Sequence, residues 1–204
     1  MKKLITKTID LSSGDAETKR LEILDYFEKT WEIDEKLYSQ LRSDDVFYHR
    51  GDPLRHVLLF YLGHTAVFFI NKLFLAKIIE TRINPSFESI FAIGVDEMSW
   101  DDLDEKHYNW PTVSEVRAYR DKAKMLLREV ILNTSLVLPV TWEHPFWIIM
   151  MGIEHERIHL ETSSVLIRQL PLEQVVVGKF GEIWKDAGAA PANRFLPVTG
   201  AEMD

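Results

Sequence analysis

Apolar side chains recur at helical spacing in four separate stretches of the chain. In the first stretch, about residues 17–41, they return every three, four or seven positions: Leu21, Leu24, Phe27, Trp31, Tyr38 and Leu41. Acidic residues and lysines fill most of the remaining positions, which is typical of an amphipathic outer helix. The third stretch opens on Thr112-Val-Ser-Glu115, a capping box that predicts a helix start, and it closes at about Asn133.

The other two stretches are more apolar and are therefore expected to be buried. The second opens with Asp52 as a candidate N-cap and Pro53 at the first helical position, and it stays apolar to about Ile79. The fourth begins near Pro145 and ends before Pro171, because proline cannot continue a helix. These two elements are predicted to form the centre of the fold.

The segments between and after these helices lack periodicity. Residues 82–110 contain Asn84-Pro85, Gly94 and an acidic run, which predict a long connection with one short helix. Residues 172–204 are rich in small residues and proline, as in a linker. We therefore expect an all-α fold: an antiparallel four-helix bundle over residues 1–171, with a long crossover between the second and third helices and a C-terminal extension over 172–204.

Composition narrows the classes of function. A net charge of −8 with mixed acids and bases argues against a nucleic-acid binder. The chain has no cysteine, so any metal site must use histidine or carboxylate ligands. The N-terminus lacks the apolar core of a signal peptide, and the apolar run 57–70 is interrupted by Gly63 and His64, so a cytoplasmic location is expected with no membrane span.

The segment His155-Glu-Arg-Ile-His159 carries the main chemical signal. On a helix, two imidazoles four positions apart lie about 40° apart around the axis and one turn apart along it, which suits one divalent metal ion. An unpaired imidazole in an apolar helix would lose hydration without compensation, so ligation is favoured over structural hydrogen bonding. Glu156 could orient a ligand imidazole or act as a base.

The same five residues spell His-Glu-x-x-His, the zinc-protease signature. Zinc proteases take a third ligand from downstream, and no histidine follows His159, while Glu173 and Glu182 lie beyond Pro171. A better third ligand lies upstream at His64, which interrupts the most apolar helix. A His64, His155 and His159 face would suit Fe(II), with Zn(II) as the alternative.

Other aromatic and histidine residues are weaker candidates. His56 is a reserve ligand near the start of the second helix, whereas the remaining histidines fall in expected loops or at a helix start: His49, His107 and His144. Four tryptophans around the crossover and the start of the fourth helix would be core residues or an aromatic wall over the site: Trp100, Trp110, Trp142 and Trp147.

Three longer blocks carry a family resemblance. His155-Glu-Arg-Ile-His159-Leu-Glu161, together with His64, resembles the pattern of DinB-like domains in sulfoxide synthases of thiohistidine biosynthesis. The blocks 53–64, 94–103 and 152–171 are similar to the amino-terminal domain of 5-histidylcysteine sulfoxide synthases, the family of ovothiol biosynthesis, and together the resemblance spans most of the chain.

This resemblance implies a mononuclear non-haem iron held by His64, His155 and His159. It also implies an oxygen-dependent oxidoreductase reaction in which cysteine sulfur is joined to the histidine imidazole as a sulfoxide, with cysteine, histidine and O₂ as substrates. Full-length members continue into a formylglycine-generating-enzyme-like domain, and the segment 193–200 resembles the linker into it. The chain would then be a fragment or a stand-alone relative, and its activity alone is an open expectation.

Two alternatives remain at this point. A stand-alone DinB-like thiol transferase or hydrolase would use zinc to lower the pKa of a bound thiol or water. A non-catalytic interaction module would keep the fold and bind a partner through its acidic crossover or its tail. The residues do not decide the oligomeric state.

Overall fold

The computed structural model describes residues 9–93, 108–176, 188, 192, 194 and 195. Over these residues the fold is helical, which confirms the all-α prediction, and extended pairing is confined to one isolated bridge between Leu41 and Val175. The α-helices are α1 (Ala16–Tyr38), α2 (Leu58–Leu75), α3 (Pro85–Ile90), α4 (Val113–Asn133) and α5 (Pro145–Arg168). Two short 3₁₀ turns accompany them, η1 (Asp44–Tyr48) and η4 (Leu172–Gln174).

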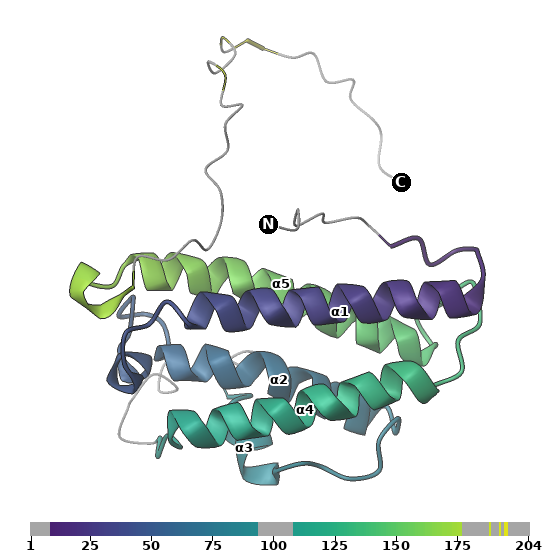
Figure 1. Ribbon diagram of the computed structural model, residues 1–204, viewed down its shortest axis with the longest axis horizontal. Coiled ribbons are helices and arrows are strands. Elements are labelled where there is room, and N and C mark those ends of the chain that lie inside the picture. The colour runs from purple at the N-terminus through teal and green to yellow at the C-terminus, as the bar shows by residue number, and fades with distance from the viewer. Residues whose placement is uncertain (1–8, 94–107, 177–187, 189–191, 193, 196–204) are drawn as a thin grey trace, which may run out of the picture.

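Four long helices run side by side along the long axis of the molecule (Figure 1). Around the bundle, α1 packs on α4 and α5, and α2 packs on the same two helices from the other side. Helix α2 runs against α5, and α1 runs against α4, as the prediction required. However, α1 runs parallel to α5, and α2 runs parallel to α4, because the crossover that holds α3 returns the chain to the end where α2 began (Figure 1).

The local start signals of the helices are partly realised. The capping box forms: the Thr112 hydroxyl accepts from the Glu115 amide at 3.3 Å, and the Glu115 carboxylate accepts from the Thr112 amide at 2.8 Å. Asn84 caps α3 with Pro85 in its first turn, which confirms the predicted short helix in the crossover. Pro145 opens α5 behind His144, whose side chain accepts from the Phe146 amide.

The predicted start of the second helix at Asp52 and Pro53 is wrong. The Asp52 carboxylate accepts from the Leu54 amide at 2.8 Å, which closes a local turn instead of a helix. Helix α2 begins at Leu58, whose amide donates to the His49 carbonyl at 3.1 Å. A tertiary contact therefore replaces the side-chain cap, and α2 also ends earlier than predicted, at Leu75, before Lys77 takes a positive φ of 57°.

The core lies between α2 and its neighbours. Among the described residues, α2 is the one helix long and apolar enough to cross a membrane by length and composition, which the sequence had not suggested, yet 72% of that stretch is buried inside the bundle. Close packing against α5 requires Gly152, because a Cβ there would lie 3.0 Å from Cζ of Phe69 and closer still to two other ring atoms. The apolar composition of α2 is thus explained by its central position.

Candidate metal centre

His64 lies in the buried middle of α2 with its ring orientation fixed by a backbone group. Its Nδ1 is 2.7 Å from the carbonyl oxygen of Phe91, the residue that follows α3. A carbonyl can only accept a hydrogen bond, so Nδ1 carries a proton, and in the neutral ring Nε2 keeps its lone pair. This is the arrangement that orients a histidine for ligation through Nε2.

His155 and His159 lie on the side of α5 that faces His64. The Nε2 atoms of His155 and His64 are 3.3 Å apart, and those of His155 and His159 are 3.2 Å apart. One nitrogen of each ring falls in a group whose members all lie within 4.8 Å of one another. The structure therefore brings together all three histidines that the sequence singled out, from two antiparallel helices.

Aromatic side chains of α2 hold two of these rings in place. Phe68 stacks on His155 with ring centroids 3.6 Å apart and planes 9° apart. Phe60 stacks on His64 at 5.1 Å and 14°. Because Phe60, His64 and Phe68 are each four residues apart, they share one face of α2. This spacing was readable in the sequence but was not recognised there.

Burial keeps the imidazoles neutral. Desolvation, followed by the neighbouring His159 and His64, lowers the pKa of His155 to about 3. Desolvation and then His64 lower the pKa of His159 to about 4. At neutral pH these rings carry no charge, so their converging nitrogens can offer lone pairs to a cation.

The nitrogen separations suit one transition-metal ion. With metal–nitrogen bonds of about 2.0–2.1 Å, two ligands at angles between about 90° and 109° lie roughly 2.9–3.4 Å apart. Both of these separations fall in this range, and the third pair, His64 and His159, lies within 4.8 Å. The Nδ1 atoms of His155 and His159 are buried and have no hydrogen-bond partner among the described residues. The donor set thus fits a three-histidine site in which, within the part of the chain that the structure describes, only His64 has a protein partner for its second nitrogen.

The two acidic residues near the histidines do not join this cluster. Glu156 is fully buried, about 100° around α5 from His155, and its carboxylate is 3.9 Å from Arg120. It therefore neither orients a ligand ring nor faces the site as a base. Glu161 is exposed.

The remaining histidines lie elsewhere. The reserve ligand His56 is buried before α2 and stacks on Phe60 at 4.2 Å, outside the three-histidine group. His49 is exposed and contacts Gln174, and His144 caps α5. His107 lies outside the described residues.

Three of the four candidate tryptophans lie among the described residues, and they differ in their surroundings. Trp110 stacks on Tyr108 at 4.9 Å and contacts Phe60, so it packs next to the ring that supports His64. Trp142 and Trp147 are 76% and 46% exposed, so neither is the core residue that the sequence favoured. Trp100 lies outside the described residues.

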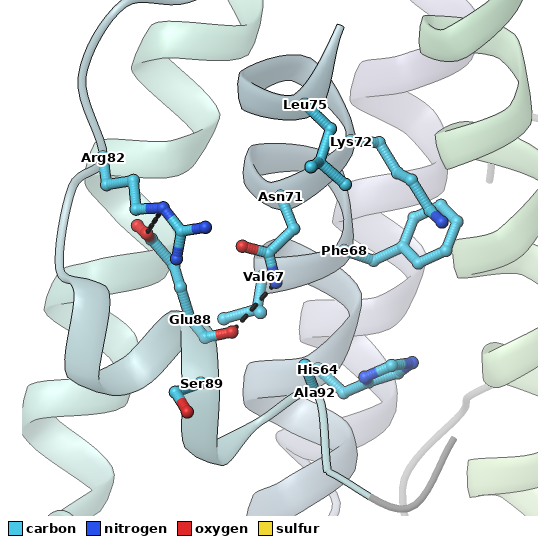
Figure 2. Close-up of a pocket in the computed structure, with 10 residues that line it drawn as sticks. All are labelled: His64, Val67, Phe68, Asn71, Lys72, Leu75, Arg82, Glu88, Ser89 and Ala92. Carbon is cyan, nitrogen blue, oxygen red and sulfur yellow. Dashed lines mark hydrogen bonds and ion pairs between the residues drawn. The ribbon is translucent and has the colours of Figure 1, made fainter. Parts of the chain in front are cut away.

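A cavity of about 280 Å³ opens beside His64, between α2 and the α3 segment. Figure 2 shows His64 at one end of it, with Arg82 and Leu75 toward the other. Asn71 and Glu88 line the cavity: the buried Oδ1 of Asn71 has no hydrogen-bond partner among the described residues, and Oε2 of Glu88 lies 3.8 Å from Nε of Arg82. The cavity thus combines the unsatisfied amide oxygen of Asn71, the Arg82–Glu88 ion pair and the cationic Lys72 next to a candidate ligand.

Comparison with known proteins identifies distant relatives of this chain. The chain is 27% identical over 158 residues to ergothioneine biosynthesis protein 1 of Neurospora crassa, which covers 73% of this chain and 17% of that protein. It is 25% identical over 154 residues to the protein of the same name from Schizosaccharomyces pombe, covering 71% and 19%. No protein-family model matches the chain. The chain is thus distantly similar to proteins of ergothioneine biosynthesis and spans less than a fifth of their length.

Proposed function

We propose that this chain is the iron-binding bundle domain of a sulfoxide synthase that joins cysteine sulfur to the histidine imidazole, as in ovothiol biosynthesis. The observation that carries the proposal is the convergence of three imidazole nitrogens from α2 and α5. The similarity to proteins named for ergothioneine biosynthesis supports the same class of product, a sulfur-substituted histidine.

The reaction sets requirements on the site. A cysteine thiol, an imidazole C–H and O₂ combine so that one oxygen atom ends in the sulfoxide and the other leaves as water. Fe(II) held by three histidines leaves coordination positions open and supplies the redox chemistry that such an O₂-dependent coupling needs. In this chain, His64, His155 and His159 would hold the ion, and Phe60 and Phe68 would keep the imidazoles from rotating.

The cavity beside His64 supports a small polar substrate. Lys72 places positive charge at its wall, which suits the carboxylate of an amino acid, whereas Arg82 is paired with Glu88. The unsatisfied Oδ1 of Asn71 suits an ammonium group. A site that offers acceptors and cations together discriminates against ligands that lack either charge.

We further propose that a formylglycine-generating-enzyme-like domain covers the histidine face of α5. Exposed apolar residues follow one another along this helix at spacings of four and seven, next to the two histidines: Trp147, Met151, Ile158 and Val165. Such a row of apolar side chains is typical of a surface that packs on another domain. The substrates would then bind between the bundle and that domain.

Metal content tests the site. Purified chain reconstituted anaerobically with Fe(II) should retain about one iron per chain. His64→Ala, His155→Ala and His159→Ala should each lower the iron content at least tenfold, because two nitrogens cannot hold the ion as three do. His49→Ala is the control, since that histidine is exposed and away from the cluster. Iron content unchanged in all three variants would refute the site.

Activity is tested separately. The chain and a purified formylglycine-generating-enzyme-like domain should together convert cysteine, histidine and O₂ into the coupled sulfoxide, detected by mass. Ile158→Ser should weaken binding between the two proteins in calorimetry, whereas Met125→Ser should not, although both residues are 64% exposed. Zinc retained on isolation, with no oxygen consumed in the presence of both domains, would instead favour a zinc-dependent thiol transferase or hydrolase.

A further inference from the structure

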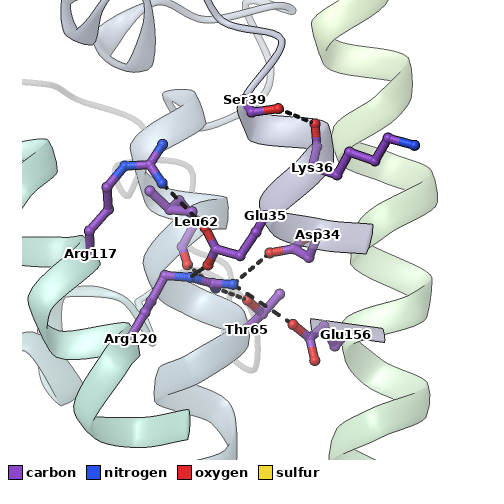
Figure 3. A network of polar contacts seen from close by, with 9 residues as sticks. All are labelled: Asp34, Glu35, Lys36, Ser39, Leu62, Thr65, Arg117, Arg120 and Glu156. Carbon is purple, nitrogen blue, oxygen red and sulfur yellow. Dashed lines mark hydrogen bonds and ion pairs between the residues drawn. The ribbon is translucent and has the colours of Figure 1, made fainter. Parts of the chain in front are cut away.

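A buried arginine joins all four long helices behind the three-histidine cluster. Arg120 of α4 is only 1% exposed, and its guanidinium lies over the Trp31 ring at 4.4 Å. Figure 3 shows the groups that surround it. They come from α1, α2 and α5: Asp34, Glu35, Leu62, Thr65 and Glu156.

The contacts to α2 bracket His64 in sequence. Nη1 of Arg120 donates to the Leu62 carbonyl at 2.7 Å and to the Thr65 hydroxyl at 2.9 Å. At about 100° per residue, these two positions lie on the side of α2 away from His64. A fixed guanidinium at the back of the helix therefore sets the rotation of α2 about its axis, and with it the direction of the His64 ring.

The contacts to α1 and α5 complete the frame. Nη2 donates to Asp34 at 2.9 Å and lies 3.9 Å from Glu156, the residue after His155. Nε donates to Glu35 at 2.7 Å, and Glu35 is held in turn by Arg117 at 3.2 Å. A planar guanidinium presents its N–H groups in a fixed fork, so it constrains the three helices relative to one another more strictly than a flexible ammonium could.

From this geometry we propose that Arg120 is a positioning residue for the three-histidine site. It fixes the rotation of α2 and α5 so that the Nε2 atoms of His64, His155 and His159 converge. Only the metal-binding test of this role rests on the proposed function, because the alignment of the three imidazoles can be measured without metal. Arg120 touches none of the three rings and acts through the backbone and the neighbours of the ligands.

The test compares two buried arginines. Arg120→Lys keeps the charge and loses the fork. Arg20→Lys is the matched control, because Arg20 is also buried and donates to two carbonyls, Ile131 and Thr134, both at 2.6 Å. Its contact at Ile131 lies about three turns further along α4 from Arg120. Both variants should lose stability, so stability alone does not distinguish a positioning role from a structural one.

Two readouts make the distinction. In long-range ¹H–¹⁵N spectra of the metal-free protein, the imidazole signals of His64 and His155 should move in Arg120→Lys and stay in place in Arg20→Lys. Co(II) chloride should bind Arg120→Lys about tenfold more weakly, with altered visible absorption, and bind Arg20→Lys as it binds the unmodified chain. Imidazole signals and Co(II) spectra that respond equally to both substitutions would overturn the proposal.

A milder variant covers the case in which Arg120→Lys does not fold. Thr65→Val keeps the side-chain shape and removes one acceptor of the guanidinium, and it should shift the His64 signal and weaken Co(II) binding by a smaller factor. An unchanged spectrum in Thr65→Val would then overturn the proposal. If the unmodified chain binds no Co(II) while the imidazole signals still respond to Arg120→Lys, the metal function fails and the positioning role stands.

Discussion

Gly152 gives the sharpest stability prediction, because its replacement forces a defined clash between α5 and α2. An alanine Cβ at this position would lie 3.0 Å from Cζ of Phe69 and closer to two more ring carbons, whereas carbon atoms in contact prefer about 3.5–4.0 Å. The ring cannot swing away freely, since Phe69 is buried and packs edge-on against Phe27 at 6.0 Å. The helices must therefore separate or the ring must leave its preferred rotamer.

The expected size follows from two opposing terms. Overpacking of this kind costs about 1–3 kcal/mol. Glycine to alanine in a helix interior returns up to about 1 kcal/mol through helix propensity. We expect Gly152→Ala to lower the free energy of unfolding by about 1–2 kcal/mol, which for a chain of this size corresponds to a fall of about 2–8 °C in Tm.

Urea unfolding followed by circular dichroism measures the effect, with Glu161→Ala on the exposed face of α5 as the control. Combining Gly152→Ala with Phe69→Leu tests the cause, because the smaller side chain frees the space that the Cβ needs. The double variant should be less destabilised than the sum of the single variants. A Gly152→Ala protein as stable as the unmodified chain, or strictly additive effects in the double variant, would refute the clash.

Three further outcomes are expected. Burial raises the pKa of Asp34 to about 6 despite the opposing Arg120. The protonated Asp34 carboxyl group therefore stabilises the fold fully below pH 3.8, the pKa in the unfolded state, and this stabilisation is lost as the pH rises through 6. In urea unfolding from pH 4 to 7, the unmodified chain should lose on the order of 3 kcal/mol of unfolding free energy, and Asp34→Asn should not show this loss. Parallel pH profiles of the two proteins would contradict the assignment. Thr112→Ala should cost about 1 kcal/mol in thermal unfolding by removing the capping box of α4, and no change in Tm would count against that role. Fe(II) should raise the Tm by an amount that grows with its concentration, and a chelator should reverse the rise. The rise should be absent in His155→Ala, and an equal rise in that variant would show that Fe(II) binds elsewhere.

The outer helices show how much local sequence could predict. The periodicity of α1 and the capping box of α4 place each helix within a few residues of its observed bounds. These signals are local, because a capping hydroxyl and the amide it accepts from are three residues apart. The turn at Asp52 shows the limit of local signals. The Asp52 carboxylate accepts a hydrogen bond from a nearby amide, as an N-cap would, but the helix begins only at Leu58, whose amide donates to the His49 carbonyl.

The candidate site divides in the same way. Spacing on one helix paired His155 with His159, and an isolated polar residue in an apolar helix identified His64. The partners of these residues were not predictable, because they are distant in sequence: the Phe91 carbonyl is 27 residues from His64, and Arg120 is 58 residues from Leu62. The assignment of Glu156 failed for the same reason, since nothing local indicates that Arg120 lies behind α5.

The sequence by itself determined which segments are helical and which three histidines could converge, because periodicity and spacing are properties of one helix at a time. Tertiary structure alone decided which tautomer His64 adopts and that Glu156 faces a buried arginine instead of the imidazoles. Those outcomes depend on distances between helices. Such distances are set by side-chain packing, such as Gly152 on Phe69, that no local pattern encodes.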